Sequence, residues 1–427
     1  MLWLYRLLFL PALIVLAPRY LLRMRRRGGY REKFGQRFGA HEGLPQKRAG
    51  VRRVWIQAVS VGEVLAITPL VEALVKEGGV EVYLTTTTST GYRVAVDRYA
   101  PFTIGVGYFP IDWWLFSARA WRRVAPDLVI LTEGERWPEH IHQAGARGVP
   151  VICINARMSD RTFQRLRRFA FARRAVLGGI TRLLAGSVQD ERRLRELGVA
   201  AERVATTGNL KLDVRIPRLT DDERGRLRRE LGLGDGLVLL GSSTWPGEEA
   251  VLIETWRELK AGGMTCGLLI VPRHAERRPE IERLVRATGA TYHLRSRGAA
   301  TDRVEVAIGD TTGELRRLTQ LADLVFIGKS LPPNEGGQTP VEAAALGKPI
   351  VFGPAMSNFR TIARELVDGG GAVQVADELA LKAELKALAG DAARREKMAA
   401  AAADWQRANA GAVERTLAVV REELARR

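Results

Sequence analysis

Short apolar runs alternate with segments of helical period along most of the chain. In the first half, the runs that we expect to be strands are residues 53–59, 80–87, 127–133, 149–155 and 182–187. In the second half, the expected strands are residues 237–243, 267–273, 304–309, 324–328 and 349–353. Apolar strands separated by helices are typical of β-α-β units, so the pattern predicts two doubly wound α/β domains that face each other across a cleft.

A polar, proline-containing segment, residues 207–226, lies between the two series of strands and is expected to be the linker. We therefore expect one domain over residues 28–214 and a second over residues 215–427, with the last helix able to pack back on the first domain. Ligands of such sheets bind at the carboxyl ends of the strands. The residues that follow each strand are accordingly the candidates for function.

The first 22 residues are mostly apolar and are followed at once by an arginine cluster at residues 23–27. This length is close to the roughly 20 residues that cross a bilayer, although Pro11 and Pro18 interrupt the run. A cleaved signal peptide has its positive charge before the apolar run, whereas most of the charge here comes after it. We expect residues 1–27 to be an uncleaved anchor, inserted or interfacial, with the arginines on the cytoplasmic side, rather than a buried globular helix.

The chain of 427 residues has a formal net charge of +18, and two segments account for it: residues 1–53 and residues 157–182. Neither segment shows the exposed aromatic interleaving or the modules of nucleic-acid binders, so no nucleic-acid partner is expected. The two cysteines, Cys153 and Cys266, lie in apolar runs and exclude a disulfide framework. We expect both to be buried thiols in a reducing compartment.

The first expected strand runs into Ser60-Val61-Gly62-Glu63, which should open a helix. Glu63 either stabilises the first turn through the helix dipole or faces the cleft as a general base, with Gly62 allowing a ligand to approach closely.

The run from Thr85 to Gly91 either presents hydroxyl and N–H groups to a sugar or phosphate or caps a helix. Residues 133–138 combine two acids with an arginine and a tryptophan, which suits sugar recognition but also a surface ion pair.

In the second half, Arg273 ends an expected strand, and an arginine in that place can hold a phosphate through two hydrogen bonds. Residues 309–315 form an expected strand-to-helix turn suited to an anion. Residues 336–344 form a glycine-rich loop with Pro340 in the first helical turn and Glu342 placed either to hold a ribose hydroxyl or to cap the helix.

Spacing excludes several familiar sites. Gly328-Lys329-Ser330 looks like the end of a P-loop, but that motif requires glycine at position 323, which is Asp323. No GxGxxG motif follows the first expected strand, and none of the five histidines lies in HExxH or beside a cysteine pair. We therefore expect no dedicated metal site.

Eight segments in this order resemble the 3-deoxy-D-manno-octulosonic acid (Kdo) transferases, over nearly the whole chain. They are SVGE (60–63), TTTTSTG (85–91), ExExWP (133–138), NARxS (155–159), TGNLKxD (207–213), VPRHxER (271–277), GDTxGEL (309–315) and GGxxPxExA (336–344). The resemblance implies a GT-B glycosyltransferase of two Rossmann-like domains, the first binding the acceptor and the second the CMP-sugar. It implies inverting transfer of Kdo from CMP-Kdo to a hydroxyl of the lipid A precursor lipid IVA, in lipopolysaccharide biosynthesis, with no metal or other cofactor.

The resemblance also implies roles for individual residues. Glu63 would be the general base. The CMP-binding residues would be Pro272, Arg273, Thr312, Gly313, Glu314, Thr339, Pro340, Val341 and Glu342. Candidates for binding the acceptor or the sugar are Ser60, Gly62, Thr87, Thr88, Glu133, Glu135, Arg157 and Lys211. The enzyme would lie on the cytoplasmic face of the inner membrane, held against anionic lipid by residues 1–27, while residues 157–182 either grip phosphates of the acceptor or form a solvated basic face.

The chain departs from the family pattern in the part expected to meet the donor sugar. Trp245 stands where the family usually has histidine, and the loop usually written GGHNPLE reads GGQTPVE at residues 336–342. The segment before that loop is also a residue longer, and Gly134 and Arg136 replace more usual residues. Two alternatives therefore stay open: a related GT-B enzyme that uses another nucleotide sugar on a lipid acceptor, and a non-enzymatic, membrane-tethered binding protein.

Overall fold

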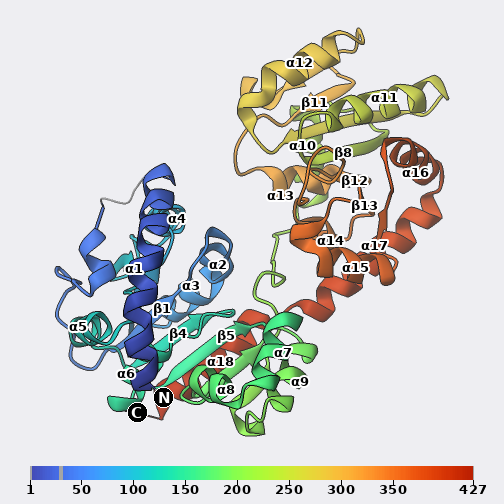
Figure 1. Ribbon diagram of the computed structural model, residues 1–427. Coiled ribbons are helices and arrows are strands. Elements are labelled where there is room, and N and C mark those ends of the chain that lie inside the picture. Colours follow the sequence, from blue (N-terminus) through green and yellow to red (C-terminus); the bar gives the residue numbers. More distant parts are fainter. Residues whose placement is uncertain (1, 28–31, 427) are drawn as a thin grey trace. The chain divides into compact units, whose positions relative to one another are not determined.

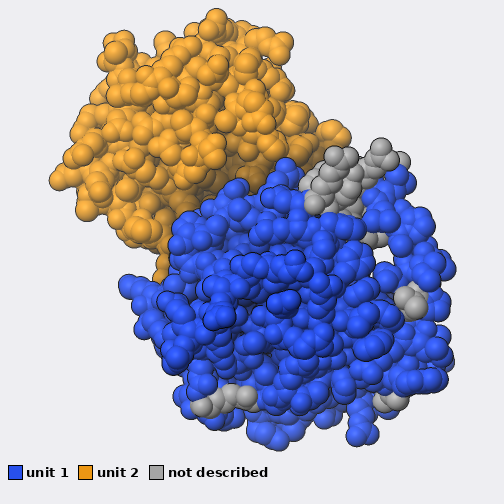
Figure 2. Space-filling view, turned by 90° about the vertical axis from the view of Figure 1, so that its left-hand side faces the viewer, with its two compact units in different colours: residues 1–213, 411–427 blue, residues 214–410 orange. Residues whose placement is uncertain are grey.

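The computed structural model describes residues 2–27 and 32–426, which form two compact units. Unit 1 comprises Met1–Asp213 and Gly411–Arg427, and unit 2 comprises Val214–Ala410 (Figure 2). Each unit contains one seven-stranded sheet in which all paired strands are parallel. The fold class is therefore α/β, with helices between successive strands, as the sequence pattern predicts (Figure 1).

The sheet of unit 1 has the order β3-β2-β1-β4-β5-β6-β7. Its strands are β1 (Arg52–Gln57), β2 (Val80–Thr86), β3 (Gly105–Tyr108), β4 (Leu128–Thr132), β5 (Val151–Ala156), β6 (Arg182–Ala185) and β7 (Val204–Thr206). Its helices are α1 (Leu2–Arg27), α2 (Val61–Ala66), α3 (Thr68–Lys76), α4 (Ser89–Tyr99), α5 (Trp114–Val124), α6 (Pro138–Ala146), α7 (Asp160–Arg168), α8 (Ala170–Leu177), α9 (Val188–Glu196) and α18 (Ala412–Ala425), with 3-10 turns at Phe34–Phe38 and Ala201–Arg203.

The sheet of unit 2 has the order β10-β11-β9-β8-β12-β13-β14. Its strands are β8 (Leu237–Thr244), β9 (Cys266–Pro272), β10 (Tyr292–Leu294), β11 (Val306–Ile308), β12 (Leu324–Ile327), β13 (Ile350–Phe352) and β14 (Ala372–Gln374). Its helices are α10 (Asp221–Glu230), α11 (Glu248–Ala261), α12 (Arg278–Arg286), α13 (Leu315–Leu318), α14 (Val341–Ala345), α15 (Arg360–Asp368), α16 (Glu378–Gly390) and α17 (Ala392–Asn409), with 3-10 turns at Ala275–Arg277, Arg295–Arg297, Thr319–Leu321 and Ser357–Phe359.

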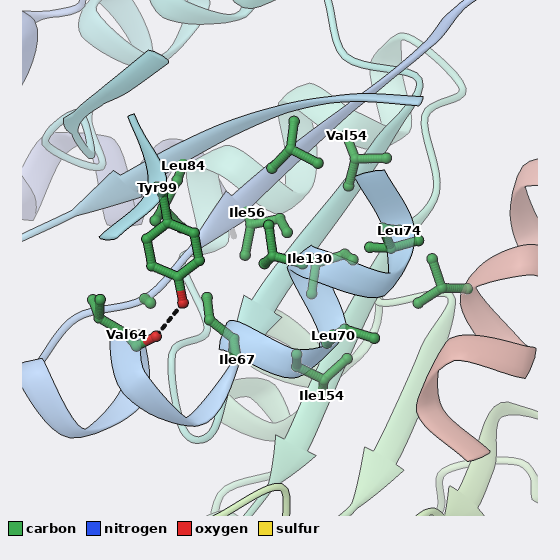
Figure 3. Packing of buried hydrophobic residues seen from close by; sticks show 14 of the residues in the cluster. Val54, Ile56, Val64, Ile67, Leu70, Leu74, Leu84, Tyr99, Ile130 and Ile154 are labelled. Carbon is green, nitrogen blue, oxygen red and sulfur yellow. Dashed lines mark hydrogen bonds between the residues drawn. The ribbon is translucent and has the colours of Figure 1, made fainter. Parts of the chain in front are cut away.

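Both faces of each sheet are covered by apolar side chains. On β1, Val54 and Ile56 point into one cluster and Trp55 points into the other, because successive residues of a strand face opposite sides. Figure 3 shows Val54 and Ile56 packed with Leu70 and Leu74 of α3. Complete burial of such a side chain contributes about 1.5–3 kcal/mol to stability, so these layers fix the positions from which the strand-end loops emerge.

The last helix, α18, belongs to unit 1 although it follows unit 2 in the chain. The carboxylate of Asp213 accepts hydrogen bonds from the backbone N–H groups of Gly411 (3.0 Å) and Val413 (2.7 Å), which lie at the start of this helix. Arg415 donates to the carbonyl oxygen of Thr207. The units divide between Asp213 and Val214, one residue before the expected boundary, and the last helix belongs to unit 1, which the sequence analysis allowed.

The predicted linker is wrong in its second part, because residues 221–226 lie in α10. Thr220 and Glu223 form a capping box at the start of this helix, in which each side chain accepts the other residue's backbone N–H. Four strands were also missed: β3, β7, β10 and β14 have only three or four residues each, and all four lie at the edge of a sheet.

Candidate functional site

The strand order reverses between β1 and β4 in unit 1 and between β8 and β12 in unit 2. In open α/β sheets, ligands bind at the carboxyl ends of the two strands on either side of such a reversal. Most of the residues that the sequence singled out follow these strands or their neighbours.

Glu63 lies at the reversal in unit 1, in the first turn of α2. Ser60 caps this helix and accepts the backbone N–H of Glu63 through its hydroxyl oxygen. The Glu63 carboxylate, which is 8% exposed, accepts hydrogen bonds from the Val59 N–H (3.0 Å), the Ser60 hydroxyl (2.9 Å) and the Thr132 hydroxyl of β4 (2.5 Å). Thr132 was not predicted, since it is 69 residues away in the chain. These three donors hold the carboxylate in one orientation.

Two further carboxylates follow β4. Glu133 has a left-handed backbone (φ 52°), forms an ion pair with Lys211 and accepts a hydrogen bond from Asn155, which is also left-handed (φ 51°). Burial raises the pKa of Glu135 to about 7, and the negative charges of Glu63 and Glu133 act in the same direction. Strained backbone of this kind concentrates at functional sites. The structure thus brings the predicted Glu63, Glu133, Glu135 and Lys211 together.

The threonine run divides between a strand and a helix cap. Thr85 and Thr86 end β2, and Thr88 caps α4 by accepting the Gly91 N–H (3.1 Å) while donating to the Val59 carbonyl oxygen (3.0 Å). Gly91 is required sterically, because a Cβ there would lie 2.8 Å from the Thr88 hydroxyl oxygen. The hydroxyl of Thr87 is buried and has no partner among the described residues.

No steric constraint within unit 1 requires glycine at position 62. A Cβ at this position would meet only the Ser60 hydroxyl oxygen, at 3.9 Å. A Cβ atom at position 62 would therefore fit without a collision.

A basic surface follows β5. Arg157 comes directly after this strand and is exposed, and α7 and α8 continue the predicted basic segment, residues 157–182. Phe169 and Phe171 are 42% and 60% exposed between these arginines, so the expectation that this segment has no exposed aromatic residues among its cations is wrong. Exposed phenylalanine rings among cations suit an anionic lipid surface better than a purely solvated face.

In unit 2, the predicted Pro272 and Arg273 come at the end of β9. Pro272 is buried, whereas Arg273 is exposed and its backbone N–H donates to the carbonyl oxygen of Thr244 at the end of β8 (3.1 Å). No ion pair joins the Arg273 side chain to a carboxylate in the part of the chain that the structure describes. Its guanidinium is therefore free to bind an anion.

The turn after β11 leaves Thr312 and Gly313 exposed. Burial raises the pKa of the next residue, Glu314, but hydrogen bonds from Arg295 and Thr311 outweigh this effect, so the pKa lies below its usual value. The helix that follows, α13, has only four residues. The helix dipole at the predicted anion site therefore comes from a helix of only four residues.

The loop before α14 contains the remaining predicted residues. Pro340 is the N-cap of this helix rather than a residue of its first turn, and the Thr339 hydroxyl oxygen accepts the Val341 N–H (3.3 Å). Glu342 forms an ion pair with Arg316 (2.7 Å), which follows the turn at Thr312–Glu314 by two residues. This ion pair joins the two segments that the sequence assigned to one nucleotide site.

Glu248 is a buried residue to which the sequence assigned no role. Its carboxylate accepts backbone N–H groups from Trp245 (2.8 Å), Lys329 (2.8 Å), Ser330 (2.9 Å) and Leu331 (3.2 Å). It thereby fastens the loop after β8 to the loop after β12, at the reversal in unit 2. Its only signal in the sequence is an acid in the first turn of a helix that follows a strand.

Helix α1 is attached to unit 1 by polar contacts near its start. Arg6 donates two hydrogen bonds to the carboxylate of Glu139 (2.8 and 2.9 Å), and Tyr5 donates to Asp112 (2.6 Å). Many other side chains of the helix are apolar and exposed, among them Trp3 and Val15. The side chains of the arginine cluster at residues 23–27 lie outside the described residues.

Among the described residues, no single helix is long and apolar enough to cross a bilayer; only Leu2–Phe9 and Pro11–Arg19 together meet the criterion, across a bend of 41°. The same residues contain no group of three or more histidine, cysteine, aspartate or glutamate side chains that could hold a metal ion.

Comparisons of the sequence with known proteins indicate one family, and a comparison with solved structures shows the fold. Residues 32–214 match the model of the 3-deoxy-D-manno-octulosonic-acid transferase (kdotransferase) family. The 3-deoxy-D-manno-octulosonic acid transferase of Bordetella pertussis is 36% identical over 92% of this chain and 93% of its own, and that of Haemophilus influenzae is 30% identical over 93% and 92%. Among solved structures, UDP-GlcNAc 2-epimerase from Neisseria meningitidis shares the fold, with a TM-score of 0.55, 13% identity and coverage of 88% of this chain and 100% of its own.

Proposed function

The chain belongs to the 3-deoxy-D-manno-octulosonic acid (Kdo) transferase family, and from this premise we propose that it transfers Kdo from CMP-Kdo to a hydroxyl of the lipid A precursor lipid IVA. Family membership makes it a glycosyltransferase of the GT-B fold, which removes the alternative of a non-enzymatic binding protein. The acceptor, the site residues and the place in the cell belong to the proposal.

Glu63 is the general base of the proposed reaction. The acceptor hydroxyl attacks the anomeric carbon of Kdo, its proton passes to the Glu63 carboxylate, and the bond from that carbon to the CMP phosphate breaks. The donors from Val59, Ser60 and Thr132 fix the orientation of the carboxylate. A base that is already oriented loses little entropy in the transition state, which is the general advantage of positioned catalytic groups.

Unit 2 holds the donor in this proposal. Arg273 is an exposed cation with no acidic partner among the described residues, and it would bind the phosphate of CMP. Thr312–Glu314 and Thr339–Glu342, joined through Arg316, would surround the nucleoside, with Glu342 on a ribose hydroxyl. In this proposal the cation Arg273 neutralises charge on the leaving CMP, and no metal takes part.

The acceptor is a phosphorylated lipid, and unit 1 has two surfaces that suit it. The basic segment, residues 157–182, would bind phosphates of the lipid A precursor, and each surface cation near an anionic membrane contributes on the order of 1 kcal/mol. The apolar side chains of α1 would enter the interface of the cytoplasmic face of the inner membrane. The acceptor would then be reached without leaving the bilayer.

The observation that supports this function best is that Glu63, in a chain of this family, is held by three donors at the strand reversal of unit 1. A nucleotide titration tests the donor class directly. We expect CMP to bind more tightly than UDP. Tighter binding of UDP would favour the alternative raised by Trp245, a related transferase that uses another nucleotide sugar.

A further inference from the structure

Two residues that the proposed function leaves without a role meet at the strand reversal of unit 2. Trp245 follows β8 and Lys329 follows β12, and these strands are neighbours in the sheet (Figure 1). The buried carboxylate of Glu248 accepts the backbone N–H of both residues, at 2.8 Å each. One carboxylate therefore fixes the two positions relative to each other.

The side chains of the two residues are in contact. The Lys329 ammonium lies 4.5 Å from the centroid of the Trp245 ring, and the His274 ring lies 5.5 Å from the same ring in an edge-on orientation. Attraction between a cation and a tryptophan face is favourable within about 6 Å. Throughout residues 2–27 and 32–426, no ion pair joins the Lys329 ammonium to an acid. Its charge is therefore held in place by an aromatic ring that does not neutralise it.

The backbone of Lys329 is in the left-handed region, with φ at 59°. A lysine adopts this conformation at a cost in free energy that glycine would avoid. Neighbouring loops hold it there: the Gly337 N–H donates to the Lys329 carbonyl oxygen (2.9 Å), and the Gln338 N–H donates to that of Gly328 (3.0 Å). A strained lysine in a place suited to glycine indicates that its side chain has a use.

This cation lies close to the proposed phosphate-binding residue. His274, which contacts Trp245, is the neighbour of Arg273, and the Arg273 N–H is bonded to Thr244, the neighbour of Trp245. The donor of the proposed reaction has two anionic groups, the phosphate of CMP and the carboxylate of the sugar acid. Arg273 is assigned to the first, and a second cation is needed for the second.

We propose that Lys329, positioned on Trp245, binds the carboxylate of the acidic sugar of the donor. This inference rests on the proposed function, because it takes the donor to be CMP-Kdo. It gives the departure at Trp245 a function: where the family usually has histidine, the indole supports a lysine that selects an acidic sugar.

Calorimetric titration of the full chain with CMP and with freshly made CMP-Kdo tests the proposal. Lys329→Met keeps the length of the side chain but removes its charge. We expect the affinity for CMP-Kdo to fall about tenfold, the size of a lost charge-assisted hydrogen bond, with no change in the affinity for CMP. Lys329→Arg should retain most of the affinity, and Lys397→Met, at an exposed lysine of α17, should match the wild type.

The variant Lys329→Gly distinguishes an effect on ligand binding from an effect on the stability of the fold. Glycine relieves the left-handed strain, so this variant should unfold at the same temperature as the wild type or higher and still lose about tenfold in CMP-Kdo affinity. Equal losses for CMP and CMP-Kdo would place Lys329 on the phosphate and overturn the proposal, as would unchanged affinity for both. A wild-type chain that prefers UDP to CMP would instead overturn the proposed function itself, before any variant is compared.

Discussion

The hydroxyl of Thr132, at the end of β4, donates a hydrogen bond of 2.5 Å to the carboxylate of Glu63 in α2. This contact joins the two strand ends that flank the reversal of unit 1. Thr132 is 1% exposed, so no solvent molecule can replace its hydroxyl when it is removed. The orientation of the proposed base therefore depends on a residue that does not itself meet a substrate.

Thr132→Val should reduce kcat by about tenfold with little change in KM for CMP-Kdo, because the base stays present but less well positioned. The loss corresponds to one net hydrogen bond, about 1–1.5 kcal/mol. Thr132→Ser keeps the hydroxyl and should restore most of the activity. If valine and serine variants have the same kcat, the hydroxyl does not position Glu63.

Glu135 should make unit 1 less stable as the pH rises. Burial, followed by the charges of Glu63 and Glu133, raises its pKa to about 7, against an ordinary value of 4.5. The folded chain therefore holds a proton between about pH 4.5 and pH 7 that the unfolded chain has lost, so the stability contributed by this group falls through that window.

Glu135→Gln should consequently raise the unfolding temperature at pH 8 and have little effect at pH 4.5. Because solvent screens part of the carboxyl, we expect a gain on the order of 1 kcal/mol, or about 2–4 °C. Thermal unfolding monitored by circular dichroism at both pH values is the measurement. A gain of equal size at both pH values would rule out the titration as its cause.

The ion pair between Arg6 and Glu139 should stabilise the packing of α1 on unit 1. The Glu139 side chain is fully buried and that of Arg6 is 31% exposed. Arg6→Ala should destabilise the chain by about 3 kcal/mol, near the lower end for breaking a buried pair. The matched control is Arg19→Ala, at an exposed arginine of the same helix.

Combining Arg6→Met with Glu139→Gln should recover much of that loss, since no unpaired charge then stays buried. Chemical denaturation of the wild type, Arg6→Met, Glu139→Gln and the double variant gives the coupling. Arg6→Ala with wild-type stability would mean that α1 does not dock through this pair.

Membrane association should depend on the exposed apolar side chains of α1 and not on its docking contacts. Trp3, Leu7 and Val15 are 72%, 55% and 76% exposed, so replacing all three with serine should leave the fold intact. Sedimentation with vesicles that contain anionic lipid should fall several-fold. Leu379→Ser, at a residue that is 77% exposed on α16, is the control and should sediment as the wild type does.

Arg273→Ala should weaken CMP binding by about tenfold or more, because a charged hydrogen-bond partner of the phosphate is lost. The side chain is exposed, so the fold should not change. Arg364→Ala, at an exposed arginine of α15 that pairs with Asp368, serves as the control. Unchanged CMP affinity in Arg273→Ala would remove this residue from the phosphate site.

The central strands and the loops after them could be predicted from the sequence because long apolar runs and strand-end motifs are local signals. The missed strands β3, β7, β10 and β14 are short edge strands that are only partly buried, whereas the equally short β11 and β13 are fully buried inside the sheet and form clear apolar runs. The start of α10 could have been found, since Thr220 and Glu223 form the Thr-x-x-Glu pattern of a capping box.

Contacts between distant parts of the chain could not be predicted from local patterns. Thr132 reaches Glu63 only because β1 and β4 are paired in the sheet. Lys329 reaches Trp245 only because β8 and β12 are paired and Glu248 joins their loops. The sequence identified Ser60, Glu63 and Trp245 as important positions but contained no local signal that Thr132 reaches Glu63 or that Lys329 reaches Trp245.

Transfer of Kdo from enzymatically generated CMP-Kdo to lipid IVA, with wild type and Glu63→Gln side by side and the product read by mass, tests the central claim most directly. The wild type should add Kdo, and Glu63→Gln should bind CMP with unchanged affinity while its turnover falls at least about 100-fold. Near-normal turnover in Glu63→Gln would show that this residue is not the base. Absence of a Kdo increment with folded, CMP-binding wild type would contradict the proposed donor sugar or acceptor.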